Sequence, residues 1–311
     1  MLGTKKLSYA GRLVLIKAMY KTLHSYWASI FIIPKAVLTK IEAICRNFLW
    51  DRGTKYTRTP TVAWAKICTD QKRGGLGLRM DSIWNKAAIG KLEDYTPPNE
   101  ASWTWKKVCK IRKELQEAYD QNEWTCVLGK EYTIKKGYNW LSPVIPEVEW
   151  HHLIWTKWSI PKHSFIAWLY YHQGFNTKGK LYMLGISPDS TCCICAQEEE
   201  TSQHLFFQCQ YNRKVIQCLQ AWTGVQFSTD NIQNWRQHRR FTRLKTGTLN
   251  SIINSSMYHI WMQRNGSRHE FKLISPSRCA AMIQGDIRAR IQQQARGIMS
   301  RKYRQWLEKL M

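Results

Sequence analysis

Apolar residues recur at helical spacing in the first fifty positions of the chain. After Ser8 they return every three or four residues, which predicts a helix with Ser8 as its N-cap. Pro34 suits the first turn of a second helix with the same apolar period. The expected stripes are Leu13, Leu15, Ile16, Met19, Tyr20 and Leu23, and then Val37, Leu38, Ile41, Ile44, Cys45, Phe48 and Leu49. A helical hairpin is the simplest interpretation of residues 8–50.

Turn-forming residues divide the next part of the chain. Gly74-Gly75-Leu76-Gly77 predicts a turn, and Asp81-Ser82 is expected to open a third helix that extends to Leu92. Thr96-Pro97-Pro98-Asn99 is the best linker candidate in the first half. Residues 1–95 are therefore expected to form a helical module, followed by a linker with short helices.

Helical patterns return in the second half and make the expected fold mostly α. One pattern extends from Trp150 to Leu184 with breaks at Pro161 and Gly174, and others begin near Asn212 and Thr248. Short β-hairpins are expected only near residues 191–209 and around residues 126–134.

The charge of the chain indicates which class of molecule it would bind. The 311 residues carry a formal net charge of +25, with excesses of +11 in residues 1–95, +2 in residues 96–229 and +12 in residues 230–311. Such a field attracts polyanions, and the two ends of the chain are the parts that would meet them. No stretch reaches eighteen apolar residues and the N-terminus lacks a signal-peptide pattern, so membrane spanning and secretion are disfavoured.

A compact group of cysteine and histidine residues has the spacing of metal ligands. Cys192 and Cys195 form a Cys-x2-Cys knuckle, and His204 and Cys209 follow within the same 18 residues. Three thiolates and one imidazole give a closed tetrahedral shell for one structural Zn²⁺, with no position for a catalytic water. A Cys-rich core without metal is the alternative, and disulfides fit poorly because no secretory signal is present.

The membership of this group stays open at one position. Cys193 could replace Cys192 in a Cys-x-Cys pair, and Cys218 lies close enough in sequence to be a spare ligand, although the spacing favours Cys192. The other cysteines are expected to be small core residues. The histidines that precede the group lack ligand spacing to it, so packing or solvent contacts are expected for them: His151, His152, His163 and His172.

The C-terminal excess of arginine suggests where a polyanion would bind. In residues 276–306 arginines alternate with Ile283, Ile287, Ile291 and Ile298, which is typical of a basic amphipathic helix. Contacts to phosphates would position a nucleic acid without reading its sequence. The candidate contacts are Arg236, Arg239, Arg240, Arg243, Lys245, Arg288, Arg290, Arg296, Arg301, Lys302 and Arg304.

The order of several motifs resembles one family, the region that follows the polymerase core in LINE-type non-LTR retrotransposon reverse transcriptases of plants. The second half is similar to their zinc-binding domain. The motifs there are Trp155-Thr156-Lys157-Trp158-Ser159-Ile160-Pro161-Lys162, Phe165-Ile166-Ala167-Trp168, Asn176-Thr177, Leu181 to Leu184-Gly185-Ile186, and the knuckle with His204-Leu205-Phe206-Phe207.

The first half and the segment after the knuckle extend this resemblance. The matching motifs are Leu7-Ser8-Tyr9-Ala10-Gly11-Arg12, Ile33-Pro34, Arg46-Asn47-Phe48-Leu49-Trp50, Gly74-Gly75-Leu76-Gly77, Trp84-Asn85-Lys86-Ala87 and Ile260-Trp261-Met262-Gln263-Arg264-Asn265. Together the motifs cover most of residues 5–270. The resemblance implies a polypeptide that helps a reverse transcriptase to hold its RNA template and target DNA.

The chain departs from the family where catalysis would take place. A polymerase of this kind needs paired aspartates for two metal ions, and the sequence contains no Asp-Asp dipeptide. Fingers and palm have no room before Leu7, an endonuclease is missing, and only Asp286 and Glu308 follow residue 270, too few for a ribonuclease H. The chain is therefore expected to be a post-polymerase fragment without polymerase, endonuclease or ribonuclease H active sites.

The resulting hypothesis is a non-catalytic, zinc-stabilised fragment that binds RNA or DNA without sequence specificity and resides in the nucleus, with the cytoplasm as a second location. The expected parts are a helical module (1–95), a linker with short helices (96–149), the zinc-binding domain (150–224) and a basic helical C-terminal region (225–311). Two alternatives are an accessory subunit that acts in trans with a reverse transcriptase encoded elsewhere, and a zinc-dependent protein-interaction module.

Overall fold

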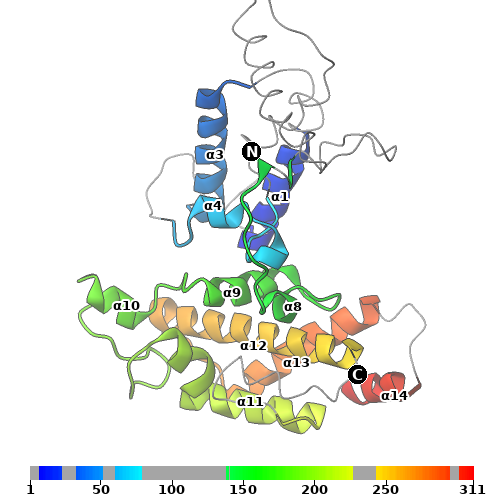
Figure 1. Cartoon of the computed structure of the whole chain (residues 1–311). Coiled ribbons are helices and arrows are strands. Elements are labelled where there is room, and N and C mark those ends of the chain that lie inside the picture. Colours follow the sequence, from blue (N-terminus) through cyan, green and yellow to red (C-terminus); the bar gives the residue numbers. More distant parts are fainter. Residues whose placement is uncertain are drawn as a thin grey trace, which may run out of the picture. The chain divides into compact units, whose positions relative to one another are not determined.

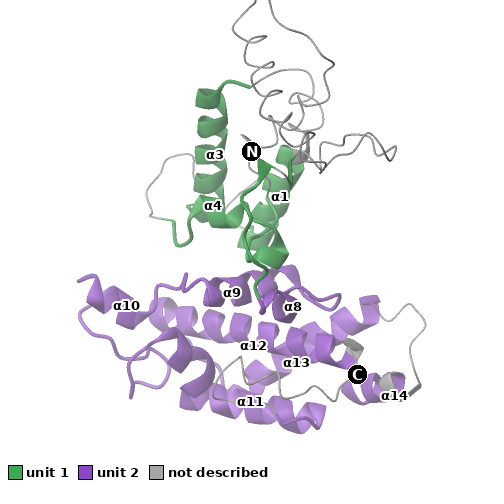
Figure 2. Ribbon diagram, viewed as in Figure 1, with its two compact units in different colours: residues 1–148 green, residues 149–311 purple. Residues whose placement is uncertain are grey.

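The computed structural model describes residues 7–22, 33–51, 60–78, 138–139, 141–226, 243–294 and 301–311. These residues form helices without any named strand, so the mostly α fold expected from the sequence is confirmed. The chain divides into two compact units, Met1–Val148 and Glu149–Met311 (Figures 1 and 2). The third helix expected near residues 81–92, the linker candidate at residues 96–99 and the hairpin near 126–134 lie outside the described residues.

The first unit contains the helical hairpin that the sequence predicts. Its helices are α1 (Tyr9–Thr22) and α3 (Lys35–Trp50), which contact each other, with the short α4 (Trp64–Ile67) and a 3-10 turn (Gln71–Arg73) after them. Ser8 caps α1, because its hydroxyl accepts a hydrogen bond from the Gly11 N–H at 3.2 Å. Pro34 lies one position earlier than expected, at the N-cap of α3.

Several apolar residues of the hairpin do not face its core. Leu15, Met19, Val37 and Ile44 are exposed, although the helical period assigned them to the buried stripes. A charged residue of α1, Arg12, is buried instead, with only 1% of its surface exposed. Its guanidinium donates to the carbonyls of Leu49 at 2.9 Å and Leu7 at 3.1 Å. Arg12 thus satisfies carbonyls at the C-terminal end of α3, where a helix leaves them without intrahelical partners.

The turn at residues 74–77 depends on glycine at two positions. Gly74 has a φ of 87° and ends the 3-10 turn in a left-handed conformation. A Cβ on Gly75 would lie 1.9 Å from the carbonyl oxygen of Thr69, so no larger residue fits there without moving the backbone. Leu76 follows directly and is fully buried.

The second unit is built around one long helix, α12 (Arg243–Glu270) (Figure 1). It contacts α8 (His151–Ile154), α9 (Pro161–Tyr171) and α13 (Pro276–Gln294). The other elements are α10 (Lys178–Met183), a π-helical turn (His204–Gln208), α11 (Gln210–Thr223), which packs against α13, and α14 (Arg301–Leu310). The helix expected from about Thr248 therefore begins earlier, at Arg243. No described helix is long and apolar enough to cross a membrane.

Much of the buried surface of α12 is polar, and its side chains satisfy carbonyls of the neighbouring segment. Asn254 donates to the carbonyls of Leu153 at 3.2 Å and Ile154 at 3.4 Å, and Ser251 donates to that of Trp158 at 2.8 Å. Buried carbonyls need such partners, because each unpaired one costs free energy. These contacts fix α8 and the segment after it against α12.

The apolar stripe of α13 agrees with the sequence pattern. Ile283, Ile287 and Ile291 are all buried, as expected for one face of an amphipathic helix. Ile298 lies outside the described residues, and the described parts of 276–306 belong to α13 and α14. Both helices belong to the second compact unit, which also contains the segment of Cys192 to Cys209.

Candidate metal centre

The first two thiols lie on a tight backbone turn. The N–H of Cys192 donates to the carbonyl of Glu198 at 2.8 Å, and the N–H of Ala196 donates back to the carbonyl of Cys192 at 2.9 Å. Ala196 has a φ of 54°, which reverses the chain directly after Cys195. An isolated antiparallel bridge between Thr191 and Glu199 closes the turn, where the sequence led us to expect a short hairpin.

The other two donors flank a single π-helical turn. His204 opens this turn and Cys209 ends it, with the Cys209 N–H donating to the His204 carbonyl at 2.7 Å. The wider π turn brings both side chains to one side although four residues separate them. The side-chain amide of Asn212 then donates to the carbonyl of Phe206 and connects the turn to α11.

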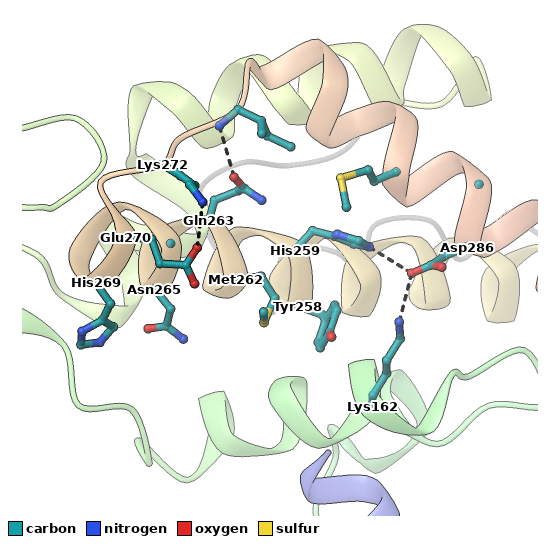
Figure 3. A pocket seen from close by; sticks show the side chains of 14 residues that line it. Lys162, Tyr258, His259, Met262, Gln263, Asn265, His269, Glu270, Lys272 and Asp286 are labelled. Carbon is teal, nitrogen blue, oxygen red and sulfur yellow. Dashed lines mark hydrogen bonds and ion pairs between the residues drawn. The ribbon is translucent and has the colours of Figure 1, made fainter. Parts of the chain in front are cut away.

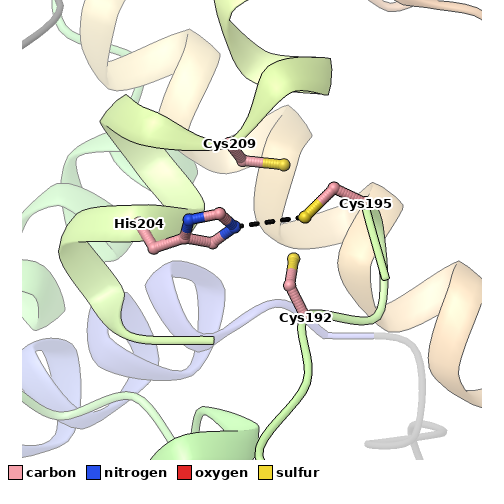
Figure 4. Close-up of side chains that lie close together, drawn as sticks. All are labelled: Cys192, Cys195, His204 and Cys209. Atoms are coloured by element: carbon pink, nitrogen blue, oxygen red, sulfur yellow. Dashed lines mark hydrogen bonds between the residues drawn. The ribbon is translucent and has the colours of Figure 1, made fainter. Parts of the chain in front are cut away.

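The four side chains converge on one point (Figure 4). The Sγ atoms of Cys192, Cys195 and Cys209 and one ring nitrogen of His204 all lie within 4.8 Å of one another, and Sγ of Cys195 is 3.3 Å from Nε2 of His204. Zn–S bonds of about 2.3 Å and Zn–N bonds of about 2.0 Å place neighbouring tetrahedral ligands roughly 3.5 to 3.8 Å apart. The cluster therefore has the donors and the dimensions for a tetrahedral zinc ion.

The structure leaves the alternative thiols outside this cluster. Cys193 is turned toward α12: its N–H donates to Glu200 at 3.2 Å, and its carbonyl accepts from Ser267 at 2.8 Å. Cys218 lies on α11 and does not belong to the cluster either. Cys192 is thus the member that the fold places with Cys195. The described cysteines form no disulfide.

The thiols of Cys192 and Cys209 interact directly. The hydrogen bond to Cys209, together with burial, raises the pKa of Cys192, whereas the hydrogen bond from Cys192 lowers the pKa of Cys209. A bound cation would favour the deprotonated form of both groups, because zinc binds thiolates rather than thiols.

A glutamate that the sequence analysis missed supports His204. Nδ1 of His204 lies 3.1 Å from Oε2 of Glu198, on the opposite side of the ring from the cluster. Carboxylates that hold the second nitrogen of a ligating histidine fix its orientation and raise its basicity. The nearby Glu199 and Glu200 have the same charge, so the sequence gives no signal that singles out Glu198.

Replacing Glu198 by glutamine is expected to weaken zinc binding about 10-fold, the low end of the 10- to 100-fold range for such partners, because Glu198 is 65% exposed. Competition with a chromophoric zinc chelator measures the affinity. Glu199→Gln is the matched control and should bind zinc as the wild type does. Equal affinities for the two variants would contradict the role of Glu198.

A buried ion pair joins the knuckle loop to the long helix. Glu200 is fully buried and Arg264 is 3% exposed, and two nitrogens of Arg264 donate to Oε1 of Glu200 at 2.9 and 2.7 Å. Arg264 also donates to the carbonyl of Asn176 at 3.1 Å. Burial alone would raise the pKa of Glu200, but the hydrogen bonds from Arg264 outweigh it and hold the pKa below its usual value. This pair gives a structural reason for Arg264 in the Ile260–Asn265 motif.

The structure describes some of the residues proposed to contact a polyanion, and these residues differ in their surroundings. Arg288 donates to the carbonyl of Leu310 at 2.7 Å, and Arg290 donates to that of Lys157 at 3.2 Å. The Lys245 ammonium lies 4.9 Å from the ring centre of Trp306, and burial lowers its pKa. Arg304 is exposed. Arg236, Arg239, Arg240 and Arg296 lie outside the described residues, as do the side chains of Arg243, Arg301 and Lys302.

Comparison of the sequence with known proteins shows what this part of the chain is similar to. Residues 132–215 match the model of the zinc-binding domain in reverse transcriptase. A protein of Arabidopsis thaliana named "Putative ribonuclease H protein" is 31% identical over 141 residues, which are 45% of this chain and 20% of that protein. The chain thus spans about a fifth of the length of this relative, and no solved structure matches it. The match confirms, over residues 132–215, the resemblance to the zinc-binding domain of reverse transcriptases that the sequence motifs indicated.

Proposed function

We propose that the chain is a non-catalytic nucleic-acid-binding fragment of a LINE-type retrotransposon reverse transcriptase, stabilised by one structural Zn²⁺. The observation that carries the proposal is the convergence of Cys192, Cys195, His204 and Cys209 inside the segment that matches a zinc-binding domain. Four protein ligands complete a tetrahedral shell, so the ion would have no open position for substrate or water. Zinc at this place would hold the fold together rather than catalyse a reaction.

The sequence supports a non-catalytic role. Nucleotidyl transfer by two metal ions requires carboxylates that are held together, and the 311 residues contain no Asp-Asp pair. The relative named for ribonuclease H is matched over a fifth of its length, so its activity is not carried over to this chain. Primer extension with Mg²⁺ on an RNA template tests this directly, and incorporation by the purified chain would contradict it.

Nucleic acid is the proposed partner because basic residues gather at both ends of the chain. Residues 230–311 carry 16 Lys and Arg against 4 Asp and Glu. Within this region, Arg288 and Arg290 also donate hydrogen bonds to carbonyls of the protein, whereas Arg304 is exposed on α14. Phosphate contacts from such residues would give affinity without sequence specificity. Residence in the nucleus, and contact with a reverse transcriptase encoded elsewhere, belong to the same proposal.

Binding to RNA or DNA is expected to weaken steeply with salt, because each phosphate contact releases counterions. The logarithm of the affinity should fall linearly with the logarithm of the salt concentration. Replacing Arg301 and Arg304 by glutamine should make this slope shallower by up to about 2, at about 0.9 per contact on duplex DNA. Fluorescence anisotropy with labelled oligonucleotides over a salt series measures the slope.

A matched pair of substitutions controls for the loss of charge. Arg213 and Lys214 are exposed on α11, outside the basic C-terminal region. The double variant Arg213→Gln/Lys214→Gln should keep the wild-type slope. Failure to bind the oligonucleotides even at low salt would contradict nucleic-acid binding and favour the protein-interaction module instead.

A further inference from the structure

Three helices of the second unit bring two histidines and an aspartate together, away from the knuckle. His163 lies on α9, His259 on α12 and Asp286 on α13. Oδ2 of Asp286 is 3.2 Å from Nε2 of His163 and 3.0 Å from Nε2 of His259. All three ligand atoms lie within 4.8 Å of one another. These distances match the spacing of neighbouring ligands around a divalent transition-metal ion, whose bonds to nitrogen and carboxylate oxygen are about 2.0 to 2.2 Å long.

Neither ring nitrogen of His163 has a hydrogen bond, although the residue is completely buried. Its Nε2 lies close to the carboxylate of Asp286 but lacks the geometry of a hydrogen bond to it. A buried polar atom without a partner costs about 1 to 3 kcal/mol, so such an atom calls for an explanation. A metal ion bound to Nε2 of His163 and to the carboxylate would give this nitrogen a partner.

The protonation of the cluster suits metal binding. Burial lowers the pKa of His163 and of His259, in spite of the opposing effect of Asp286. The adjacent His163 and His259 rings and the Lys162 ammonium hold the pKa of Asp286 below its usual range. Two imidazoles and one carboxylate are groups that bind zinc in proteins, and here all three lie at ligand distance from one another.

We propose that His163, His259 and Asp286 form a second metal site, which binds Zn²⁺ with at least one coordination position open. Two imidazoles and one carboxylate are a common protein ligand set for zinc that keeps a further position for water or another ligand. The knuckle cluster, made of Cys192, Cys195, His204 and Cys209, in contrast supplies four ligands. The chain would thus hold two zinc ions in different coordination shells.

The open position would face a cavity of about 660 Å³. His259 and Asp286 line it, together with Lys162 and Tyr258 (Figure 3). Nζ of Lys162 lies 3.6 Å from Oδ2 of Asp286 and is the cation that a metal would displace. Because the Lys162 side chain is 39% exposed, it can turn into solvent when the metal enters.

Cobalt titration of the full chain tests the second site. The knuckle is first filled with zinc, and Co²⁺ is then added while visible absorption and circular dichroism are recorded. The wild type should bind one equivalent of Co²⁺ with ligand-field bands but without the thiolate-to-cobalt charge-transfer band of a cysteine site. Asp286→Asn, which keeps the shape of the side chain, should abolish this equivalent while the knuckle zinc stays bound.

Two further variants make the outcome decisive. Glu270→Gln removes a carboxylate that lines the same cavity but lies outside the cluster, and it should leave cobalt binding unchanged. Lys162→Met removes the competing ammonium from a half-exposed side chain and should tighten cobalt binding several-fold, which a merely structural cluster would not do. Lys272→Met is its matched control within the cavity lining.

A folded wild-type protein that holds zinc in the knuckle but binds no cobalt would overturn the second site. The same conclusion would follow if Asp286→Asn bound cobalt as the wild type does, or if Lys162→Met weakened the binding. Since the knuckle zinc is measured separately in each sample, failure of the second site is distinct from failure of the proposed zinc-stabilised fragment.

Discussion

Loss of one knuckle ligand is expected to unfold the unit that contains residues 149–311. Structural zinc sites of this kind contribute about 10–16 kcal/mol at neutral pH, and much of that is free energy of folding. Domains are typically stable by only about 5–15 kcal/mol, so the unit has no margin to lose the ion. The Cys195→Ser and His204→Ala proteins should therefore lose the knuckle zinc and the cooperative thermal transition together, as measured by mass spectrometry and circular dichroism.

Two neighbouring thiols provide controls for this experiment. Cys193 and Cys218 are half-buried but lie outside the cluster. Their replacement by serine should preserve both the zinc and the thermal transition. A His204→Ala protein that melts at the wild-type temperature would show that the knuckle does not stabilise the fold.

Arg264→Met is expected to destabilise the second unit by about 3–5 kcal/mol, the cost of leaving a buried charge without its partner. Glu200 is fully buried and would lose the two hydrogen bonds that Arg264 donates. Because Glu200 also accepts hydrogen bonds from the N–H groups of Lys178 and Cys193, its carboxylate cannot simply turn outward. Urea unfolding of both proteins at neutral pH measures the difference in the free energy of unfolding.

The pH dependence gives this prediction a second test. In the wild type, Arg264 holds the pKa of Glu200 below its unfolded value, so the stability from the pair is present at neutral pH and is lost as the pH falls through the folded pKa. In Arg264→Met only burial and the backbone donors remain, and protonation of Glu200 relieves the unpaired charge. The stability difference between the two proteins should therefore shrink on acidification, over the range in which zinc stays bound.

An exposed ion pair and a double variant complete the experiment. Glu270 and Lys272 are 3.9 Å apart with mostly exposed side chains, so breaking that pair by Glu270→Gln should cost only about 0–1 kcal/mol. Adding Glu200→Gln to Arg264→Met removes the buried charge and should recover part of the lost stability. A loss for Arg264→Met as small as that for Glu270→Gln would contradict the role assigned to the buried pair.

The knuckle could be predicted from sequence because its geometry is local. Its four donors fall within 18 residues, and the Cys-x2-Cys spacing alone fixes a turn that brings two thiols together. The same spacing favours Cys192 over Cys193, and the structure agrees, because Cys193 contacts Glu200 and Ser267 and lies outside the cluster. Glu200 and Ser267 lie on segments far apart in the chain.

The cluster of His163, His259 and Asp286 had no local signal. Its members are separated by 96 and 27 residues, and the packing of three helices brings them together. Isolated histidines without ligand spacing predict packing or solvent contacts, which is how His163 was interpreted. Only the tertiary contacts of α12 with α9 and α13 reveal the common partner of the two imidazoles.

The sequence pattern also could not predict which charged side chains are buried. Helical periodicity assigns arginine to the solvent face, yet Arg12 and Arg264 are almost completely buried because carbonyls or a carboxylate surround them. In the same way, Arg288 and Arg290 could be counted as basic residues, but not recognised as donors to Leu310 and Lys157. Net charge locates a basic region, and the structure shows which of its described side chains have partners within the protein.

The coordination shell of the knuckle is the most direct test of the central claim. Zinc X-ray absorption spectroscopy on the Asp286→Asn protein, from which the second site has been removed, would report the knuckle ion alone. We expect three sulfur ligands at about 2.3 Å and one nitrogen ligand at about 2.0 Å from a single zinc per chain. A folded protein without zinc, or zinc surrounded by nitrogen and oxygen only, would contradict the zinc-stabilised fragment proposed for this chain.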